Sequence, residues 1–305
     1  MARTASEDLH SPAATTARAL VEALRPKQWL KNVILFAALI FSRHTFDPPY
    51  VAKAVLATAL FCILASSGYL FNDLFDARAD REHPEKRKRP IASGRLPTPV
   101  AVAAMIIGGA GSLAAAFVLS TGFGLTCLAY LALTITYTLY FKHLVILDVM
   151  GIAALFILRA VAGATAIDVA ISPWFLICVA FLSLFLAMNK RLSELLLLER
   201  TATQHRKNLG EYTPQLLERM INIVTAGAIM SYALYTFDVG AHPDKPRRLM
   251  LTIPFVLYGI FRYQYLVSRF GEGGAPEQTL ISDRPMVVNA LLYGMTVIIL
   301  LHWPA

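Results

Sequence analysis

Long apolar runs are the feature of this sequence that most restricts its fold. Stretches of about 20 predominantly apolar residues recur from Trp29 to Trp303, with short polar breaks between them. About 20 apolar residues in an α-helix cross the ~30 Å hydrocarbon core of a bilayer, where backbone groups must be paired within the segment. The mean hydropathy of +0.55 and the 16% of charged residues argue against a soluble enzyme and exclude disorder, a coiled coil and a secreted disulfide scaffold. The pattern predicts an all-α integral membrane protein.

The runs predict nine transmembrane helices. Their approximate bounds are 29–46, 51–71, 98–120, 122–141, 144–164, 172–190, 216–238, 249–267 and 286–303. Residues 26–305 are expected to form a single polytopic membrane domain that carries the catalytic site. Residues 1–25 lack the apolar core of a signal peptide and are expected to form a flexible cytoplasmic tail. The spacing of Leu20, Val21 and Leu24 predicts a short interfacial helix at its end.

The basic residues indicate the orientation of the chain. With the N-terminus in the cytoplasm, 22 of the 28 Lys and Arg residues lie on the cytoplasmic side, 5 lie on the other side, and Arg159 lies within a span. Short cytoplasmic loops of membrane proteins carry such an excess of Lys and Arg. The net charge of +8 therefore predicts a multi-pass protein of the cell (plasma) membrane with a cytoplasmic N-terminus and active site.

A cluster of acidic residues follows the second apolar run. On a helix at 100° per residue, Asp73, Asp76 and Asp80 lie within about 60° of one another, and Asn72 widens the arc to about 100°. Carboxylates on one helix face repel each other unless a cation lies between them, and Mg²⁺ prefers oxygen ligands and often bridges to phosphate. The four residues are predicted to bind Mg²⁺ on a diphosphate. The alternative is a solvated helix end with surface ion pairs.

A basic run comes directly after this cluster. Its members that we predict to contact substrate are Arg78, Lys86, Arg87 and Arg89. Such a run alone is usually topogenic or lipid-facing. Next to a metal-type cluster it favours phosphate binding, because phosphates need Arg or Lys partners as well as metal.

In a chain with nine predicted spans, the motif NDxxDxxxD at residues 72–80 resembles the first signature of the UbiA superfamily of intramembrane prenyltransferases. The resemblance implies a nine-helix bundle with a central cavity open to lipid. It also implies that Asp73, Asp76 and Asp80 are catalytic and hold Mg²⁺ on the diphosphate. Helix count, motif position and the basic loop agree with the resemblance along the whole chain.

A second acidic motif of DxxxD type lies near the end of the sixth helix in superfamily members that use a prenyl diphosphate. Here the sequence is NKRLSE at 189–194, so two cations replace the expected acids. This favours direct contact of Lys190 or Arg191 with a phosphate, with Glu194 as their partner or as a remaining metal ligand. The alternative for both cations is anchoring at a cytoplasmic helix end.

Three segments together narrow the resemblance to one branch. RPKQWLKN at 25–32, the basic run and ILDVMGIAALFILRAVAGA at 146–164 are similar to the decaprenyl-phosphate 5-phosphoribosyltransferases. The resemblance implies Mg²⁺-dependent transfer of ribose 5-phosphate from phosphoribosyl diphosphate (PRPP) to a polyprenyl phosphate, a step toward cell-wall arabinan. The expected partners are then PRPP, the lipid phosphate and the bilayer, with no nucleic acid.

Several phosphorylated groups at one site need more positive charge than one metal ion supplies. The further candidate cations are Lys27, Lys31, Lys142 and Arg159. Arg159 is costly inside an apolar helix unless it faces a polar cavity, or pairs with Asp148 or a helix-end carbonyl. Tyr137 is a candidate donor to ribose or phosphate, or a residue of the interfacial aromatic belt.

Two other functions are alternatives to phosphoribosyl transfer. An aromatic prenyltransferase of the same fold, using a prenyl diphosphate and a hydroxybenzoate-like acceptor, predicts a second acidic cluster, which KRLSE lacks. A transporter predicts ionisable residues near the middle of several spans, whereas Arg159 alone lies deep.

Gly108, Gly109 and Gly111 allow close helix packing within one subunit or between copies in a homo-oligomer.

Overall fold

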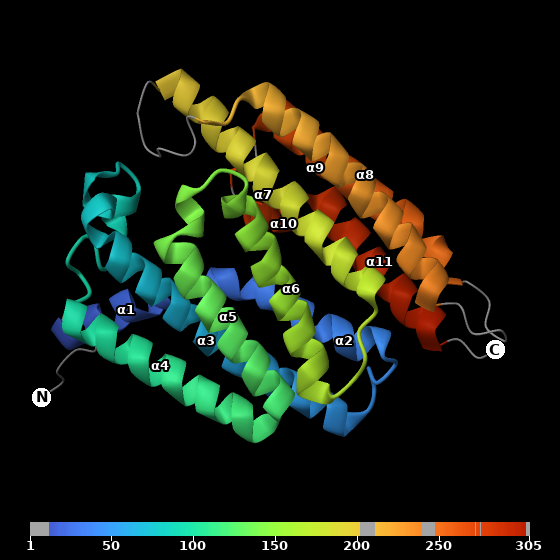
Figure 1. The fold of residues 1–305 in the computed structure, drawn as a ribbon, viewed down its shortest axis with the longest axis horizontal. Helices are drawn as coiled ribbons and strands as arrows, with labels where there is room; N and C mark the ends of the chain where they lie inside the picture. The colour runs from blue at the N-terminus through green and yellow to red at the C-terminus, as the bar shows by residue number, and fades with distance from the viewer. Residues whose placement is uncertain (1–11, 202–210, 240–247, 272, 275, 303–305) are drawn as a thin grey trace, which may run out of the picture.

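The computed structural model describes residues 12–201, 211–239, 248–271, 273–274 and 276–302 (Figure 1). Every regular element among these residues is a helix, as expected. The elements are α1 Pro12–Leu24, η2 Pro26–Leu35, α2 Phe36–Phe41, α3 Pro48–Glu82, η3 Lys86–Lys88, α4 Thr98–Leu119, α5 Thr121–Leu139, η4 Phe141–His143, α6 Leu147–Ile167, α7 Pro173–Thr201, α8 Pro214–Val239, η6 Arg248–Thr252, α9 Ile253–Phe270, α10 Pro276–Ser282 and α11 Arg284–His302.

Eight helical segments of the described chain are long and apolar enough to cross a membrane. They correspond to α3, α4, α5, α6, α7, α8, α9 and α11. The segment expected as the first span, 29–46, is instead divided between η2, a 3₁₀-helix of 10 residues, and α2, an α-helix of 6. With rises of about 2.0 and 1.5 Å per residue, the pair extends about 29 Å, close to the bilayer core. The expected count of nine continuous spans is therefore not confirmed, although this pair has the length of a ninth crossing.

The helix expected at the end of the N-terminal tail is present as α1, and residues 1–11 lie outside the described part of the chain. Its small residues Ala19 and Ala23 are buried in a cluster with Leu70 of α3. Glu22 accepts two hydrogen bonds from the Arg95 guanidinium, at 2.7 and 2.9 Å, and these hold the pKa of Glu22 below its ordinary value. Helix α1 is thus attached to the acidic end of α3 and to the segment that follows it.

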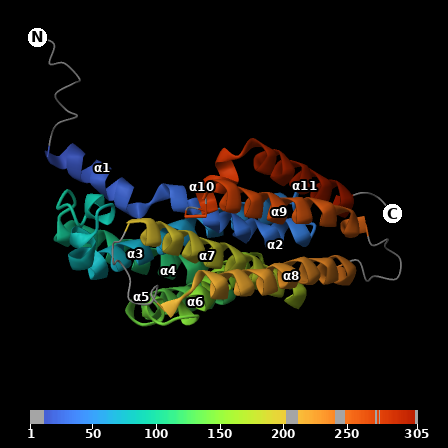
Figure 2. The same ribbon diagram turned by 90° about the horizontal axis from the view of Figure 1, so that it is seen from above.

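Two hydrophobic cores lie side by side and share α6. One joins η2, α3, α4, α5 and α6 around buried residues such as Phe61 and Tyr130. The other joins α6, α7, α8, α9 and α11 around Phe185, Leu217 and Tyr263. Figure 2 shows α9, α10 and α11 as a layer along one side of the bundle, next to α2. Helix α6 therefore connects the two halves of the molecule.

Two close helix crossings depend on glycine. A Cβ on Gly163 of α6 would lie 2.1 Å from the carbonyl oxygen of Leu35, so a larger residue would push η2 away. A Cβ on Gly108 of α4 would lie 2.9 Å from the Ser67 hydroxyl of α3, and Gly109 approaches the same side chain. The predicted small-residue contact at Gly108 and Gly109 is thus formed within one chain.

Candidate functional site

The acidic motif lies on the last turns of α3. This helix ends at Glu82 because Pro84 follows His83, and a residue before proline favours the extended backbone that His83 adopts (φ −89°, ψ 131°). Asp73 and Asp80 are 2% and 3% exposed, and Asp76 is partly exposed. Two of the three predicted carboxylates are therefore buried, where an unpaired charge would be costly.

Three cations from separate segments neutralise these aspartates. Arg89 Nη1 donates to Asp73 Oδ1 at 3.0 Å and to Asp80 Oδ2 at 2.7 Å. Lys142 Nζ, in η4, donates to Asp76 Oδ1 at 2.6 Å. Arg25 forms a further ion pair with Asp73. The structure thus brings two predicted cations, Arg89 and Lys142, onto the predicted acidic face. The alternative of pairs confined to the exposed helix surface does not describe these contacts.

Arg25 is a cation on the acidic face that we did not predict. Its backbone is left-handed (φ 55°, ψ 59°) directly before Pro26, a conformation that the following proline disfavours. Its guanidinium lies 5.3 Å from the ring centre of Tyr69 as well as on Asp73. The Ser66 hydroxyl donates to the carbonyl of Leu24 at 2.8 Å, which holds the chain at this bend. The feature of the sequence that could have indicated this role is the position of a cation directly before a helix-breaking proline.

The remaining predicted cations of the basic run and of η2 are more peripheral. Arg78 and Arg87 are exposed, and Lys86 is half-buried in the basic run. Lys27 is exposed and Lys31 half-buried on η2, at the same end of the bundle as Arg25.

The donor set of the acidic face suits Mg²⁺. It consists of carboxylate oxygens and the amide oxygen of Asn72, which accepts from Thr138 at 3.4 Å. Among the described residues, no three His, Cys, Asp or Glu side chains are grouped to hold a metal by themselves. Mg²⁺ is commonly bound through one or two carboxylates, with substrate phosphates and waters as its other ligands. The residues therefore fit a magnesium ion that arrives with a phosphorylated substrate.

A second buried network surrounds the KRLSE segment. Arg191 Nε donates to Asp148 Oδ2 at 2.8 Å, and Arg191 Nη1 donates to Glu194 Oε2 at 2.7 Å. The Tyr212 hydroxyl donates to Asp148 Oδ1 at 2.8 Å and accepts from the backbone N–H of Ile146 at 2.7 Å. Burial raises the pKa of Tyr212, so its hydroxyl remains a donor. Arg191 and Glu194 were predicted site residues, whereas the part of Tyr212 was not.

The end of α5 and the connection to α6 join the two networks. Tyr137 is half-buried near the end of α5. Its neighbour Thr138 contacts Asn72, and Lys142 contacts Asp76. The backbone N–H of Ile146, in the connection to α6, donates to the Tyr212 hydroxyl of the second network. Figure 1 shows the end of α3, the α5–α6 connection and the end of α7 on the same side of the bundle. The structure thus brings the two predicted motifs, more than 100 residues apart in the sequence, to one region.

Arg159 lies in the core of the first half rather than among these carboxylates. It donates to Asn32 Oδ1 at 3.0 Å, to the Tyr130 hydroxyl at 2.7 Å and to the carbonyl of Leu155 at 3.0 Å. It is 4% exposed. Asp148, the carboxylate considered as its partner, pairs with Arg191 instead. Arg159 therefore links α6 to η2 and α5 through neutral groups and a helix carbonyl.

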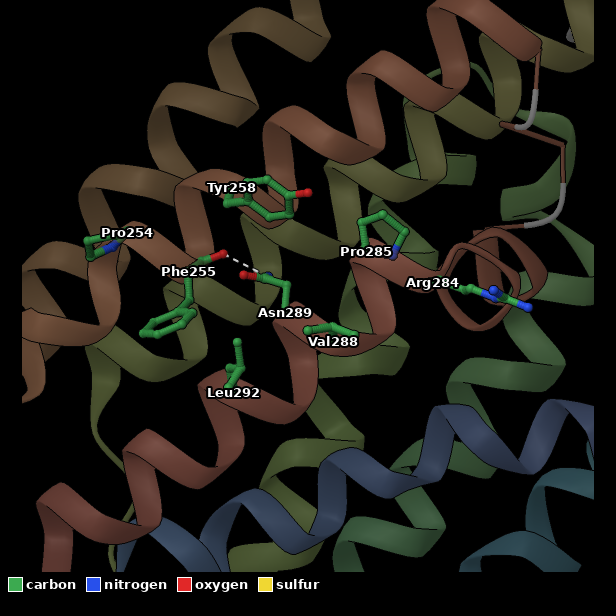
Figure 3. A pocket seen from close by; sticks show the side chains of 8 residues that line it. All are labelled: Pro254, Phe255, Tyr258, Arg284, Pro285, Val288, Asn289 and Leu292. Carbon is green, nitrogen blue, oxygen red and sulfur yellow. Dashed lines mark hydrogen bonds between the residues drawn. The ribbon is translucent and has the colours of Figure 1, made fainter.

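A separate groove of about 580 Å³ lies between α9 and α11 (Figure 3). Its lining is mostly apolar, with Phe255, Val288 and Leu292 on its walls and Arg284 at one end. The Asn289 amide donates to the carbonyl of Phe255 at 3.0 Å across it. None of the predicted site residues lines this groove, so it is distinct from the charged site.

Comparison with known proteins confirms the resemblance seen in the sequence. The model of the UbiA prenyltransferase family matches residues 33–269. The decaprenyl-phosphate phosphoribosyltransferase of Corynebacterium glutamicum is 38% identical over 307 residues, covering 98% of this chain and 92% of that protein. The protein of the same name from Mycobacterium tuberculosis is 35% identical over 298 residues, covering 96% of this chain and 97% of that protein.

The fold has a counterpart among solved structures. A UbiA homologue from Archaeoglobus fulgidus bound to DMAPP and Mg²⁺ superposes with a TM-score of 0.70 at 20% identity, covering 92% of this chain and 98% of that chain. The predictions of an all-α, multi-pass membrane protein and of an enzyme of the transferase class are confirmed. The chain belongs to the UbiA prenyltransferase family.

Proposed function

We propose that this protein transfers 5-phosphoribose from PRPP to polyprenyl phosphate, decaprenyl phosphate in particular, in a Mg²⁺-dependent reaction. The observation that carries the proposal is the convergence of Arg25, Arg89 and Lys142 on the aspartates at one end of α3. A site built from both signs of charge suits a metal–diphosphate, which presents cation and anion together. The names of the two curated relatives support the choice of substrates.

The ion pairs described above have a role in this reaction. Asp73, Asp76 and Asp80, with Asn72, would hold the metal, and the three cations would move from carboxylate to phosphate oxygens. When bound, Mg²⁺ supplies charge neutralisation for the leaving diphosphate. Arg25 and Arg89 are each 27% exposed in the side chain, so both can reach a ligand at the surface of the cluster. Cations that are already in position stabilise the negative charge that develops on the leaving diphosphate in the transition state.

The chemical step is a displacement at the anomeric carbon of the ribose. A phosphate oxygen of the lipid forms the new C–O bond while the bond to the diphosphate oxygen breaks, and the electron pair leaves with the diphosphate. The acceptor is already an anion, so no strong general base is needed. Direct displacement inverts the configuration at this carbon. Lys27 and Lys31, near the start of η2, are candidates for binding the lipid phosphate.

The placement of the reaction follows from the charge pattern. The net charge of +8 and the bias of basic residues support a plasma-membrane protein whose N-terminus and active site face the cytoplasm. The polyprenyl tail would lie between helices that open to lipid, with the product serving as an arabinan precursor. Residues 26–305 would then form one catalytic membrane domain.

The test is an assay of purified protein in lipid vesicles with Mg²⁺. One reaction receives labelled PRPP and polyprenyl phosphate, and a parallel reaction receives a prenyl diphosphate and 4-hydroxybenzoate. Asp76→Asn is expected to lower phosphoribosyl transfer at least 100-fold, because it removes a charged ligand and the partner of Lys142. Chelation of Mg²⁺ should abolish transfer, and added Mg²⁺ should restore it.

The matched control is Asp168→Asn. Asp168 is exposed, follows α6 at the opposite end from Asp148, and has a left-handed backbone (φ 55°) that asparagine adopts readily. This variant should keep the wild-type rate. Consumption of the prenyl diphosphate pair alone, or a normal rate in Asp76→Asn, would show that the proposed reaction is wrong.

A further inference from the structure

In the network around Arg191, side-chain exposure increases from Asp148, which is fully buried, to Glu194, which is accessible. The side chain of Asp148 is 0% exposed, that of Arg191 is 4% exposed and that of Glu194 is 31% exposed. Each is hydrogen-bonded to the next, at 2.8 and 2.7 Å. A planar guanidinium fixed by one carboxylate orients a second one with little rotational freedom. Glu194 is therefore held in place from within the protein.

The buried Asp148 lies close to an unusual backbone conformation at Ile146. Ile146 is β-branched and has a positive φ of 69°, a conformation that costs about 1–3 kcal/mol and persists when its surroundings impose it. The Tyr212 hydroxyl binds the Ile146 N–H and also Asp148, so one group holds both the strained backbone and the buried carboxylate. Tyr212 is thus a candidate positioning residue for Arg191 and, through it, for Glu194.

The charge of this network differs from that of the α3 cluster. Two carboxylates, Asp148 and Glu194, share the single guanidinium of Arg191, so these three hydrogen-bonded side chains together carry an excess of negative charge. Carboxylates accept hydrogen bonds from hydroxyl groups, and an acidic side chain is a common partner of ribose hydroxyls.

One short segment connects the two regions. Lys142, which contacts Asp76, and Ile146, which contacts Tyr212, are four residues apart, so their Cα atoms are at most about 14 Å apart. PRPP carries a diphosphate on the anomeric carbon of the ring and hydroxyl groups on the following two carbons, whereas a prenyl diphosphate has no hydroxyl groups. Lys190 lies one helical turn before Glu194, on the same face of α7.

We propose that Glu194 accepts hydrogen bonds from the 2- and 3-hydroxyls of the ribose of PRPP and thereby selects a pentosyl donor over a prenyl donor. Tyr212, through Asp148 and Arg191, positions this carboxylate. The inference rests on the proposed function and adds to it the group that recognises the sugar.

The experiment measures the binding of two sugar phosphates to the full-length protein in detergent, by displacement of labelled PRPP in the presence of Mg²⁺. The two competitors are ribose 5-phosphate and 2-deoxyribose 5-phosphate, which differ by one hydroxyl. A hydrogen bond to a charged group corresponds to a preference of about 10- to 100-fold for ribose 5-phosphate in the wild type. Glu194→Ala should bring the ratio close to one, and Glu194→Gln, which keeps the shape, to a few-fold.

Two further variants separate positioning from simple damage. Tyr212→Phe keeps the ring and every charge but removes both hydrogen bonds, so it should lower the ratio while PRPP still binds. Glu218→Gln is the matched control, because Glu218 is exposed on α8 and takes no part in the network, and its ratio should equal that of the wild type. Melting temperatures of Glu194→Gln and Tyr212→Phe show that each variant is folded.

Three outcomes would overturn the inference. They are a wild type that does not discriminate between the two sugars, a Glu194→Ala variant that keeps the wild-type ratio, and Glu194 variants that change only the Mg²⁺ concentration needed for PRPP binding. The last would identify a metal ligand. A wild type that binds neither PRPP nor ribose 5-phosphate would instead refute the proposed function itself.

Discussion

Arg89 should stabilise the fold as well as the site, because it bridges two buried carboxylates. The change to make is Arg89→Ala. It would leave Asp80, which is 3% exposed, without the guanidinium at 2.7 Å, and Asp73 with Arg25 as its cation. An uncompensated buried carboxylate is strongly destabilising, since its desolvation is no longer offset by a partner.

The size of the effect follows from the exposure of the pair. Breaking a fully buried ion pair costs about 3–5 kcal/mol, and breaking an exposed one costs about 0–1 kcal/mol. The Arg89 side chain is 27% exposed, so we expect an intermediate loss of about 2 kcal/mol. For a chain of this size that corresponds to a fall in melting temperature of roughly 4 °C. Asp80→Asn in the Arg89→Ala background should recover about half of it, because a neutral amide costs less to bury.

The assay is thermal unfolding of purified protein in one detergent, followed for the wild type, Arg89→Ala, the double variant and Lys88→Ala. Lys88 is the control, since it is an exposed neighbour whose contact is a surface pair with Glu85, and its removal should change stability by less than about 0.5 kcal/mol. An Arg89→Ala protein that melts with the wild type, or a double variant less stable than Arg89→Ala, would refute the reasoning.

Further predictions concern packing and pH. Gly163→Ala should lower the melting temperature by several degrees, because its Cβ would lie 2.1 Å from the Leu35 carbonyl; unchanged melting would contradict the close crossing. Gly111→Ala on α4, with no atom within 4 Å of the added Cβ, should instead stabilise by about 0.5–1 kcal/mol through helix propensity, which the same melting experiment checks. Hydrogen bonds from Arg262 lower the pKa of Asp283 from its ordinary 3.8. The stability that this pair contributes is therefore present above pH 3.8 and lost as the pH falls through the lowered pKa, so Asp283→Asn should melt below the wild type at pH 7, with a gap that closes in acid. A gap that does not depend on pH would assign the effect to capping of α11 alone.

Local pattern was sufficient to predict that the aspartates of α3 share one face of the helix. The spacing of Asp73, Asp76 and Asp80 places them on one side of any helix, and apolar length identified the helix that carries them. Arg89 and Lys142 were predicted as cations of the site from charge alone. The partner of each, and the burial of Asp73 and Asp80, required the packing of η4 and the basic run against α3.

Contacts between distant segments account for what the sequence did not reveal. Tyr212 is 64 residues from Asp148, and nothing in its local sequence distinguishes it from an interfacial tyrosine. Arg25 reaches Asp73 through a left-handed backbone that the sequence does not predict. The 3₁₀ form of η2 could not be predicted either, because apolar composition does not distinguish a 3₁₀-helix from an α-helix.

The ion pairs on α3 have a consequence for competition in the cell. Inorganic phosphate is an abundant anion, and a cluster of Arg25, Arg89 and Lys142 without carboxylate partners would attract it. Because each cation already has a carboxylate partner, an entering anion must replace these contacts before it gains any of its own. A small anion offers too few oxygens for that exchange, whereas a diphosphate that brings its own metal satisfies the carboxylates and the cations together. Under the proposed function, this charge balance is expected to keep inorganic phosphate from occupying the site of the donor diphosphate.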